Sequence, residues 1–215
     1  MTSVMAFIFL IIIAFFLGSI PNGVVVGRLF YGIDIRKVGS GNIGTTNAIR
    51  AMGKKGGYLV FLLDFGKGLL AGFIALGLLH VGAPGADQAN GIILGRPEFL
   101  AAAFCACVLG HIFSPWLGFK GGKGIAVAIG CLFVTYGPIG AIIELAIFAV
   151  VVVATKYVSA GSICSAIACW PLAFYYFWGH PLAIVLCCTG AGFVIWAHRE
   201  NIKRLREGTE RKVGS

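Results

Sequence analysis

The sequence predicts an all-α integral membrane protein: a single bundle of about seven transmembrane helices, with short re-entrant or interfacial helices on the cytoplasmic side. Hydrophobic residues make up 59% of the 215 residues and charged residues only 12%, far below the roughly one quarter that is charged in a soluble domain. Apolar runs also follow one another along the chain and leave no room for a separate soluble domain. We therefore treat residues 1–215 as one polytopic domain with a flexible tail at 207–215.

The apolar runs give the elements in order. Residues 4–26 are too long, and lack the basic leader, for a signal peptide, so they are the expected first span. Residues 35–52 are too polar to cross a bilayer and are expected to form an interfacial or re-entrant piece, whose short helix begins between Gly41 and Thr45. Further spans are expected at 57–79, 98–113, 124–137, 138–155, 160–178 and 181–197. Only the turn signal Tyr136-Gly137-Pro138 separates the fourth span from the fifth, so the count of seven is accurate to about one.

The basic residues fall on one side when the chain is threaded through a bilayer. That side receives Arg28, Arg36, Lys37, Arg50, Lys54, Lys55, Lys120, Lys123, Lys156 and the tail from Arg199 to Lys212. The other side receives only Arg96, in the one sizeable outer loop, 80–97. The positive-inside rule then places the amino terminus outside and the carboxyl terminus in the cytoplasm. The net charge of +9 does not indicate nucleic acid, because the cations lie between spans without interleaved aromatic residues.

All seven cysteines lie in apolar runs: Cys105, Cys107, Cys131, Cys164, Cys169, Cys187 and Cys188. We expect them to be small packing residues, because neither their spacing nor their surroundings indicate a disulfide framework or a zinc site. The sequence predicts no metal site and no cofactor.

Three polar islands interrupt the apolar chain. They are residues 39–47 with Arg50, residues 118–124, and residues 198–201. Threading the chain brings all three to the cytoplasmic side. This convergence predicts a binding site for an anion, most plausibly a phosphate, at a membrane surface.

The first island combines glycines with hydrogen-bond donors. Its glycines let several backbone N–H groups point at one place, and a helix that starts there turns its positive end toward that place. Arg50, one turn later, can offer two N–H groups to phosphate oxygens. The spacing Gly39-x-Gly41-x-x-Gly44 also fits the dinucleotide-binding fingerprint, but that motif follows a strand, and here a membrane span precedes it.

The second island carries Lys120 and Lys123 on a loop with Gly121, Gly122 and Gly124. It is not a P-loop, because one residue is missing between its glycines and no Ser or Thr follows the lysine. Such a loop can clamp an anionic headgroup or a leaving phosphate. The alternative is that the lysines only meet anionic lipid headgroups, but the packed glycines favour a shaped site.

In the third island, His198 and Asn201 are three residues apart at the end of the last span, so they share one helix face. The neighbouring basic residues are expected to be stop-transfer charges. Within the spans, Asp64 and Lys67 are expected to pair with each other. Glu144 lacks a local partner; it either meets another helix, which we favour, or carries a proton.

Four motifs resemble a known family from the first span to the tail. They are Gly18-Ser19-Ile20-Pro21; the run from Asp34 to Arg50; Gly110-His111-Ile112-Phe113 with Phe119-Lys120-Gly121-Gly122-Lys123-Gly124; and His198-Arg199-Glu200-Asn201 with Arg204-Leu205. In this order they closely resemble the bacterial membrane acyl-phosphate:glycerol-3-phosphate acyltransferases of the PlsY type. Two residues depart from the family pattern: Thr45 replaces an expected alanine and Lys156 an expected arginine.

The resemblance implies transfer of a long acyl chain from acyl phosphate to the 1-hydroxyl of glycerol 3-phosphate. The products would be lysophosphatidic acid and phosphate, made at the bacterial inner membrane for phospholipid synthesis. Together with residue chemistry, it assigns catalytic roles to His198, Asn201, Lys123 and Arg50. It assigns substrate or phosphate binding to Ser40, Gly41, Asn42, Gly44, Thr46, Asn47, Lys120, Gly121, Gly122, Gly124, His111 and Ser159. The bilayer is the expected surrounding partner, and a monomer suffices, although the residues leave the oligomeric state open.

The mechanism has two alternatives at this stage. The departing phosphate can take the hydroxyl proton, which we favour, or His198 or His111 can act as general base. The His-x-x-x-x-Asp motif of soluble-type glycerolipid acyltransferases is absent. A transporter for an organic phosphate is the alternative function, and a non-catalytic lipid-binding scaffold a weaker one. The one-sided islands argue against a transporter, since alternating access favours a site near the midplane.

Overall fold

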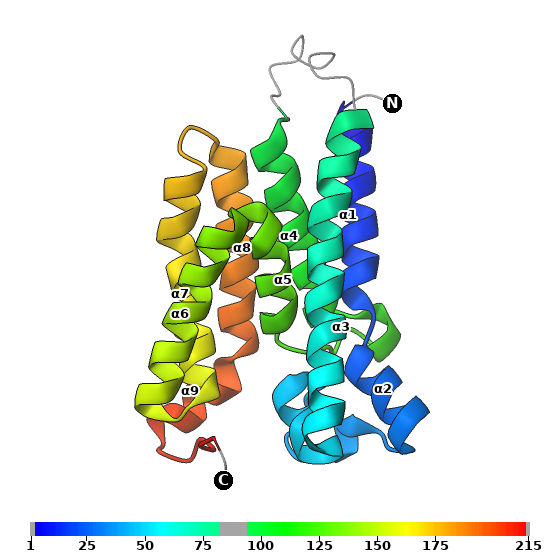
Figure 1. The fold of residues 1–215 in the computed structure, drawn as a ribbon, viewed down its shortest axis with the longest axis vertical. Helices are drawn as coiled ribbons and strands as arrows, with labels where there is room; N and C mark the ends of the chain where they lie inside the picture. The colour runs from blue at the N-terminus through cyan, green and yellow to red at the C-terminus, as the bar shows by residue number, and fades with distance from the viewer. Residues whose placement is uncertain (1–2, 82–93, 214–215) are drawn as a thin grey trace.

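The structure, a computed structural model, describes residues 3–81 and 94–213, and every regular element in these residues is a helix. The helices, in order, are α1 (Ser3–Ser19), α2 (Asn22–Tyr31), η1 (Ile35–Lys37), α3 (Thr45–Val81), α4 (Arg96–Ile112), η3 (Pro115–Leu117), α5 (Ile125–Thr135), α6 (Gly137–Thr155), α7 (Val158–Tyr176), α8 (Pro181–Ala197) and α9 (Arg199–Arg206). They form one upright bundle with the two termini at opposite ends (Figure 1). The predicted all-α membrane fold is confirmed. The predicted outer loop lies mostly outside the described residues.

The predicted count of seven spans is not confirmed. Within the described residues, five segments are long and apolar enough to cross a membrane: Ser3–Tyr31, Thr45–His80, Arg96–Leu117, Gly137–Thr155 and Val158–Tyr176. The pair α8 and α9, bent by 53°, can supply a sixth. The expected span at 124–137 contains only α5, whose 11 residues extend about 16 Å, roughly half the hydrocarbon core.

The expected first span, 4–26, is broken into two helices. α1 ends at Ser19 and α2 begins at Asn22, so Ile20 and Pro21 form the break. Pro21 has no backbone N–H to continue a helix. Just before the break, α1 packs closely on α4 at Gly18, which has no Cβ atom. A Cβ atom there would lie only 2.0 Å from the carbonyl oxygen of Cys107. The two backbones are therefore in direct contact, as is common at small-residue contacts between membrane helices.

The predicted start of a helix between Gly41 and Thr45 is confirmed, because α3 begins at Thr45; the interfacial position of this segment stays a prediction. Gly53 interrupts α3 with a φ of 73° and a ψ of −179°. A positive φ is accessible to glycine at little cost, so Gly53 can separate the short segment 45–52 from the long span that follows. This segment lies at the end of the bundle that carries the C-terminus (Figure 1).

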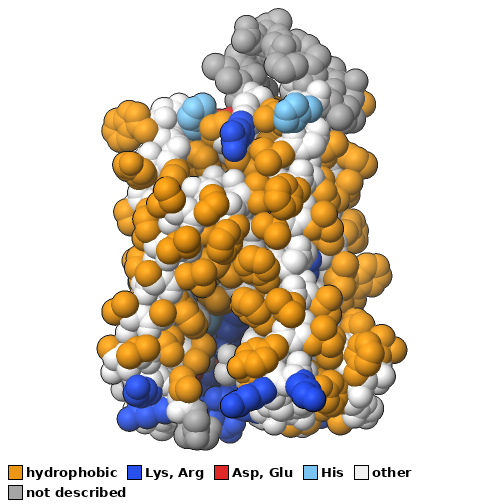
Figure 2. All heavy atoms as spheres, viewed as in Figure 1, with side chains coloured by type: hydrophobic (Ala, Val, Ile, Leu, Met, Phe, Trp, Pro, Cys, Tyr) orange, Lys and Arg blue, Asp and Glu red, His pale blue; other side chains and the backbone are white. Residues whose placement is uncertain are grey.

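The arrangement of helices leaves space at this same end. α6, α7 and α8 lie on one side of the bundle, α1 and α3 on the other, and α4 and α5 between them (Figure 1). In Figure 2, hydrophobic side chains cover the flank, whereas Lys and Arg side chains gather around a hollow at the end with the C-terminus. The seven cysteines are all free, and most are buried among the helices. The fold thus places one strongly basic end below an apolar belt.

Candidate active site

One cavity of about 1090 Å³ is lined by residues of all three islands. Every residue predicted for the site reaches its wall except Gly41, whose N–H closes a turn on the Val38 carbonyl oxygen and whose φ is 70°. The predicted residues on the wall are Ser40, Asn42, Gly44, Thr46, Asn47, Arg50, His111, Lys120, Gly121, Gly122, Lys123, Gly124, Ser159, His198 and Asn201. The folded chain therefore brings together residues that are up to about 160 positions apart in the sequence, although their individual roles remain predictions.

Asn47 organises the first island from within. Its Nδ2 lies 3.1, 3.0 and 2.8 Å from the backbone carbonyl oxygens of Ile35, Val38 and Asn42, so its two N–H groups are shared among three acceptors, and its Oδ1 accepts from the backbone N–H of Ser40 at 2.9 Å. The side chain is 2% exposed. The sequence predicted that Asn47 binds substrate or phosphate. Its polar atoms are instead used within the loop, so we assign Asn47 to shaping the site.

The loop held by Asn47 leads into the N-terminus of α3. Asn42 Oδ1 accepts a hydrogen bond from the Gly44 N–H at 2.9 Å, which fixes the turn before the helix. The first N–H groups of a helix have no partner within it and carry partial positive charge, so the start of α3 offers donors to an anion. The Thr45 hydroxyl is buried there and has no hydrogen-bond partner among the described residues. Arg50 is exposed one turn further along.

The glycine loop of the second island is anchored to the end of α4. The Gly121 N–H donates to the backbone carbonyl oxygen of Ile112 at 2.9 Å, and the Gly122 N–H donates to the backbone carbonyl oxygen of His111 at 3.0 Å. This pairing directs Lys123 inward, where its Nζ donates to Asn201 Oδ1. Burial lowers the pKa of Lys123 to about 8, partly opposed by the negative charge of Glu210. Lys123 is therefore a cation at neutral pH that a bound anion would stabilise further.

His198 lies between α8 and α9 and is 2% exposed. Its Nδ1 lies 2.8 Å from the carbonyl oxygen of Val194, which can only accept, so Nδ1 carries the ring proton and Nε2 is left as an acceptor. The neutral ring with its proton on Nδ1 therefore offers an acceptor at Nε2.

Glu210 is a site residue that the sequence analysis missed. Its carboxylate accepts hydrogen bonds from the Ser159 hydroxyl at 2.8 Å, from Asn201 Nδ2 at 2.6 Å and from Arg204 Nε at 2.7 Å. Burial would raise the pKa of Glu210, but these hydrogen bonds together lower it. The tail that we expected to be flexible is described as far as Val213, whose N–H donates to the backbone carbonyl oxygen of Lys156 at 2.8 Å. The tail 207–215 holds two acidic residues, Glu207 and Glu210, beside Arg211 and Lys212, so no sequence signal singled out Glu210.

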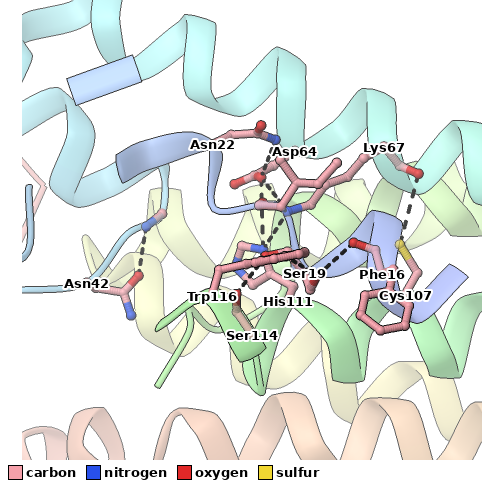
Figure 3. Close-up of polar contacts among 12 residues, drawn as sticks. Phe16, Ser19, Asn22, Asn42, Asp64, Lys67, Cys107, His111, Ser114 and Trp116 are labelled. Atoms are coloured by element: carbon pink, nitrogen blue, oxygen red, sulfur yellow. Dashed lines mark hydrogen bonds and ion pairs between the residues drawn. The ribbon is translucent and has the colours of Figure 1, made fainter. Parts of the chain in front are cut away.

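Asp64, Lys67 and His111 form a buried polar cluster beside the cavity (Figure 3). The predicted pairing of Asp64 with Lys67 is confirmed, with 2.8 Å between Oδ1 and Nζ. Lys67 Nζ also donates to the carbonyl oxygen of Ile20 at 2.8 Å and lies 3.1 Å from His111 Nδ1. Asn22 Nδ2 donates to the same Asp64 oxygen at 3.0 Å. Residues at the break between α1 and α2 thus supply hydrogen-bond partners to this cluster. The sequence analysis did not predict these contacts.

Outside the three islands the cavity wall is mostly apolar. Phe104, Leu132 and Phe148 line it, from three different helices. Glu144 also lies on this wall; as expected, it meets another helix, because Ser165 of α7 donates to its Oε2 at 2.6 Å. Its Oε1 is buried without a hydrogen-bond partner in the described part of the chain. The cavity therefore combines polar and cationic residues of the islands with a large apolar wall.

This fold and cavity define an integral membrane protein with a polar binding site at one end of a helical bundle. Comparison with known proteins identifies the family. Residues 8–208 match the family model described as "Glycerol-3-phosphate acyltransferase". The chain is 38% identical to the glycerol-3-phosphate acyltransferase of Chlorobaculum tepidum, over 97% of each chain, and 39% identical to that of Thermus thermophilus, over 97% and 96%.

Solved structures agree with this match. The crystal structure of PlsY (YgiH), an integral membrane glycerol 3-phosphate acyltransferase, superposes in its glycerol 3-phosphate form with a TM-score of 0.80 and 38% identity, over 97% of this chain and 96% of that one. Its lysophosphatidic acid form gives a TM-score of 0.77 and 36% identity, over 97% and 95%. The chain therefore belongs to the glycerol-3-phosphate acyltransferase family, and it is an integral membrane acyltransferase.

Proposed function

We propose that the enzyme transfers a fatty acyl group from acyl phosphate to the sn-1 hydroxyl of glycerol 3-phosphate. The products are 1-acyl-glycerol 3-phosphate and inorganic phosphate. The relatives' names and the two ligand forms of the similar structure support glycerol 3-phosphate as acceptor and lysophosphatidic acid as product. The acyl phosphate donor rests on the motif resemblance and on the chemistry of the cavity.

The observation that carries the proposal is the position of the Glu210 carboxylate. Ser159, predicted to bind substrate or phosphate, and Asn201, predicted to be catalytic, both donate to this carboxylate, with Lys123 bonded to Asn201 beside it. A carboxylate and a phosphate are recognised by the same charge-assisted hydrogen bonds. These donors are therefore already arranged around an anion. The start of α3 with Arg50 offers a second set of donors on the same cavity, as two phosphorylated substrates require.

The apolar wall of the cavity accounts for the acyl chain. Carbon chains bind where apolar surface leaves water, and each buried methylene contributes about 0.8 kcal/mol. The residues of this wall, among them Phe104, Leu132 and Phe148, supply such a surface in the same cavity as the cationic residues of the islands. The reactive carbonyl would then lie where the two parts meet.

Catalysis needs no enzyme nucleophile in this proposal. Acyl phosphate is a mixed anhydride with a good leaving group, so positioning the two substrates supplies most of what the reaction requires. No hydrogen bond among the described residues joins a Ser or Cys to His111 or His198. The glycerol oxygen forms a bond to the carbonyl carbon, the bond from that carbon to the phosphate oxygen breaks, and the hydroxyl proton ends on the released phosphate. His198, whose Nε2 is an acceptor, is the alternative acceptor of that proton.

We further propose that residues 1–215 form a single domain that lies in the bacterial cytoplasmic membrane, with the amino terminus outside and the carboxyl terminus in the cytoplasm. The Lys and Arg side chains at one end support this orientation (Figure 2). The cavity would then open toward the cytoplasm.

The test uses purified protein in lipid nanodiscs with palmitoyl phosphate and labelled glycerol 3-phosphate. We expect lysophosphatidic acid and phosphate in equal amounts, and no product when palmitoyl-CoA replaces palmitoyl phosphate. Product formed from palmitoyl-CoA but not from palmitoyl phosphate would overturn the proposal that acyl phosphate is the donor. Counterflow of glycerol 3-phosphate across vesicles, without any product, would instead support a transporter. Lys123→Met should abolish product, whereas His80→Gln, at the other end of the bundle, should not.

A further inference from the structure

The hydrogen bonds of Lys67 determine which nitrogen of His111 carries the proton. An ammonium group has three N–H donors and no acceptor. Lys67 Nζ meets three acceptors: Asp64 Oδ1 at 2.8 Å, the carbonyl oxygen of Ile20 at 2.8 Å, and His111 Nδ1 at 3.1 Å. All three protons of Lys67 are thereby used. His111 Nδ1 must accept, and the ring proton is therefore on Nε2.

The Nε2 side of His111 faces the glycine loop. A Cβ atom on Gly122 would lie only 2.2 Å from Nε2, so the Nε2 edge of the ring packs directly against this glycine. No described residue accepts a hydrogen bond from Nε2, and this nitrogen is not one of the fully enclosed polar atoms that lack a partner, which in the described part of the chain are Thr45 Oγ1 and Glu144 Oε1. His111 lines the cavity, so its Nε2 N–H is open to that space. This donor is therefore available to a ligand oxygen beside Gly122 and Lys123.

The cluster is more elaborate than an ion pair needs to be. Asp64 and Lys67 are 2% and 5% exposed within a membrane span, where ionised side chains are costly and are usually found at functional sites. Each already neutralises the other, yet Lys67 also bonds to His111 on another helix, and Asn22 bonds to Asp64 (Figure 3). The contact with His111 connects the pair to the cavity.

We infer that Asp64 and Lys67 hold His111 as an N–H donor, through Nε2, to an oxygen of the bound acyl phosphate on which negative charge develops during transfer. His111 is then a catalytic residue, while Asp64 and Lys67 are positioning residues. The inference rests on the proposed function and extends it. It also separates the two cavity histidines, because His198 offers an acceptor at Nε2 whereas His111 offers a donor.

Two replacements of His111 test the donor role. Gln can donate through its amide group but cannot act as a general base at neutral pH, whereas Phe can do neither. We expect His111→Phe to lower kcat by about 100-fold or more, the usual effect of losing one such donor, and His111→Gln to retain at least a tenth of wild-type kcat. Equal losses in both variants would overturn the donor role, and so would a His111→Phe enzyme with near wild-type kcat. His80→Gln is the control.

A second readout tests the positioning role directly. In ¹⁵N-histidine-labelled protein, the shifts of the two ring nitrogens show which one is protonated, and the His111 signals are those lost in His111→Gln. We expect protonated Nε2 and unprotonated Nδ1 in the wild type. In the double variant Asp64→Asn/Lys67→Met this preference should weaken, and adding His111→Phe should lower kcat by less than about threefold further. Protonated Nδ1 in the wild type would overturn the inference.

These outcomes can be told apart from a failure of the proposed function. If wild-type protein makes no lysophosphatidic acid from palmitoyl phosphate, the proposed donor is wrong whatever the histidine variants do. If the wild type is active but the His111 variants or the ring-nitrogen shifts disagree with expectation, only the further inference fails. Should the double variant not fold, the wild-type shifts and the Phe and Gln variants still decide the matter.

Discussion

The Ser159 hydroxyl donates a hydrogen bond to the Glu210 carboxylate over 2.8 Å, and so joins the first turn of α7 to the tail that follows α9. The same carboxylate accepts from Asn201 and Arg204. An acidic side chain of the protein thus lies among donors that we assign to a substrate phosphate. Any phosphate that binds there has to displace Glu210 or share its partners.

We predict that Glu210→Gln binds phosphorylated substrate more tightly than the wild type. The substitution removes a negative charge that repels phosphate but keeps the shape of the side chain. KM for one of the two substrates should fall about fivefold, equivalent to ~1 kcal/mol, with kcat changed by less than about threefold. Steady-state kinetics measure this, and Glu207→Gln, on the exposed part of the same tail, should leave KM unchanged. A higher KM would mean that Glu210 supports binding.

We predict that phosphate affinity depends on pH through Lys123. Burial lowers the pKa of Lys123 to about 8, so its charge is present below pH 8 and is lost above it. A bound phosphate favours the charged form, and inorganic phosphate keeps a constant charge in this range. Its Kd should therefore rise roughly tenfold for each pH unit above about 8. In Lys123→Arg the rise should shift to higher pH, because arginine stays protonated. Calorimetry measures both, and an identical profile in the two proteins would assign the titration elsewhere.

We predict that Asn47 supports the first island more than it binds ligand. Asn47→Ala removes the acceptor of the Ser40 N–H and the donor to three backbone carbonyls. Buried groups left without partners cost about 1–3 kcal/mol. The melting temperature should fall and amide exchange at Ser40 should accelerate, while Thr46→Ala, at an exposed residue, should change the free energy of unfolding by less than about 0.5 kcal/mol. Unchanged exchange at Ser40 would contradict this assignment.

We predict opposite effects from two glycine replacements in α3. A Cβ atom on Gly68 would lie 2.1 Å from the carbonyl oxygen of Val127 in α5, whereas a Cβ atom on Gly66 would meet nothing within 4 Å. Gly68→Ala should therefore force α5 away from α3 and cost about 1–3 kcal/mol, and it should also lower activity because α5 lines the cavity. Gly66→Ala should be neutral or stabilising by up to about 1 kcal/mol. Melting temperatures in detergent compare the pair, and equal effects would refute the close helix contact.

The sequence predicted the all-helical membrane fold and the convergence of the three islands. Both depend on simple physics: apolar length defines the spans, and the side on which cations fall defines which loops share one end. The start of a helix between Gly41 and Thr45 was also predicted from the glycine-rich residues there, and α3 begins at Thr45. The pairing of Asp64 with Lys67 followed from their separation of three residues in an apolar run.

Other features depend on tertiary contacts that no local pattern contains. The break at Ile20 and Pro21 is an exception, because Pro21 is a local signal that we did not use when we read the mostly apolar run 4–26 as one span. The short α5 merges with α6 in composition, which also affected the count of spans. Asn47 and Glu210 are polar residues near cations in the sequence, and only the folded backbone shows that one holds a loop and the other binds Ser159. Likewise, the contact of Lys67 with His111 joins two helices.

The central claim is that the three islands form a single anion site. A structure of this protein with glycerol 3-phosphate bound tests it most directly. We predict that the phosphate lies in the cavity within hydrogen-bond distance of donors from at least two islands, with Arg50, Lys123 or Asn201 among them. A phosphate bound outside the cavity, or one that contacts none of these three side chains, would contradict the account.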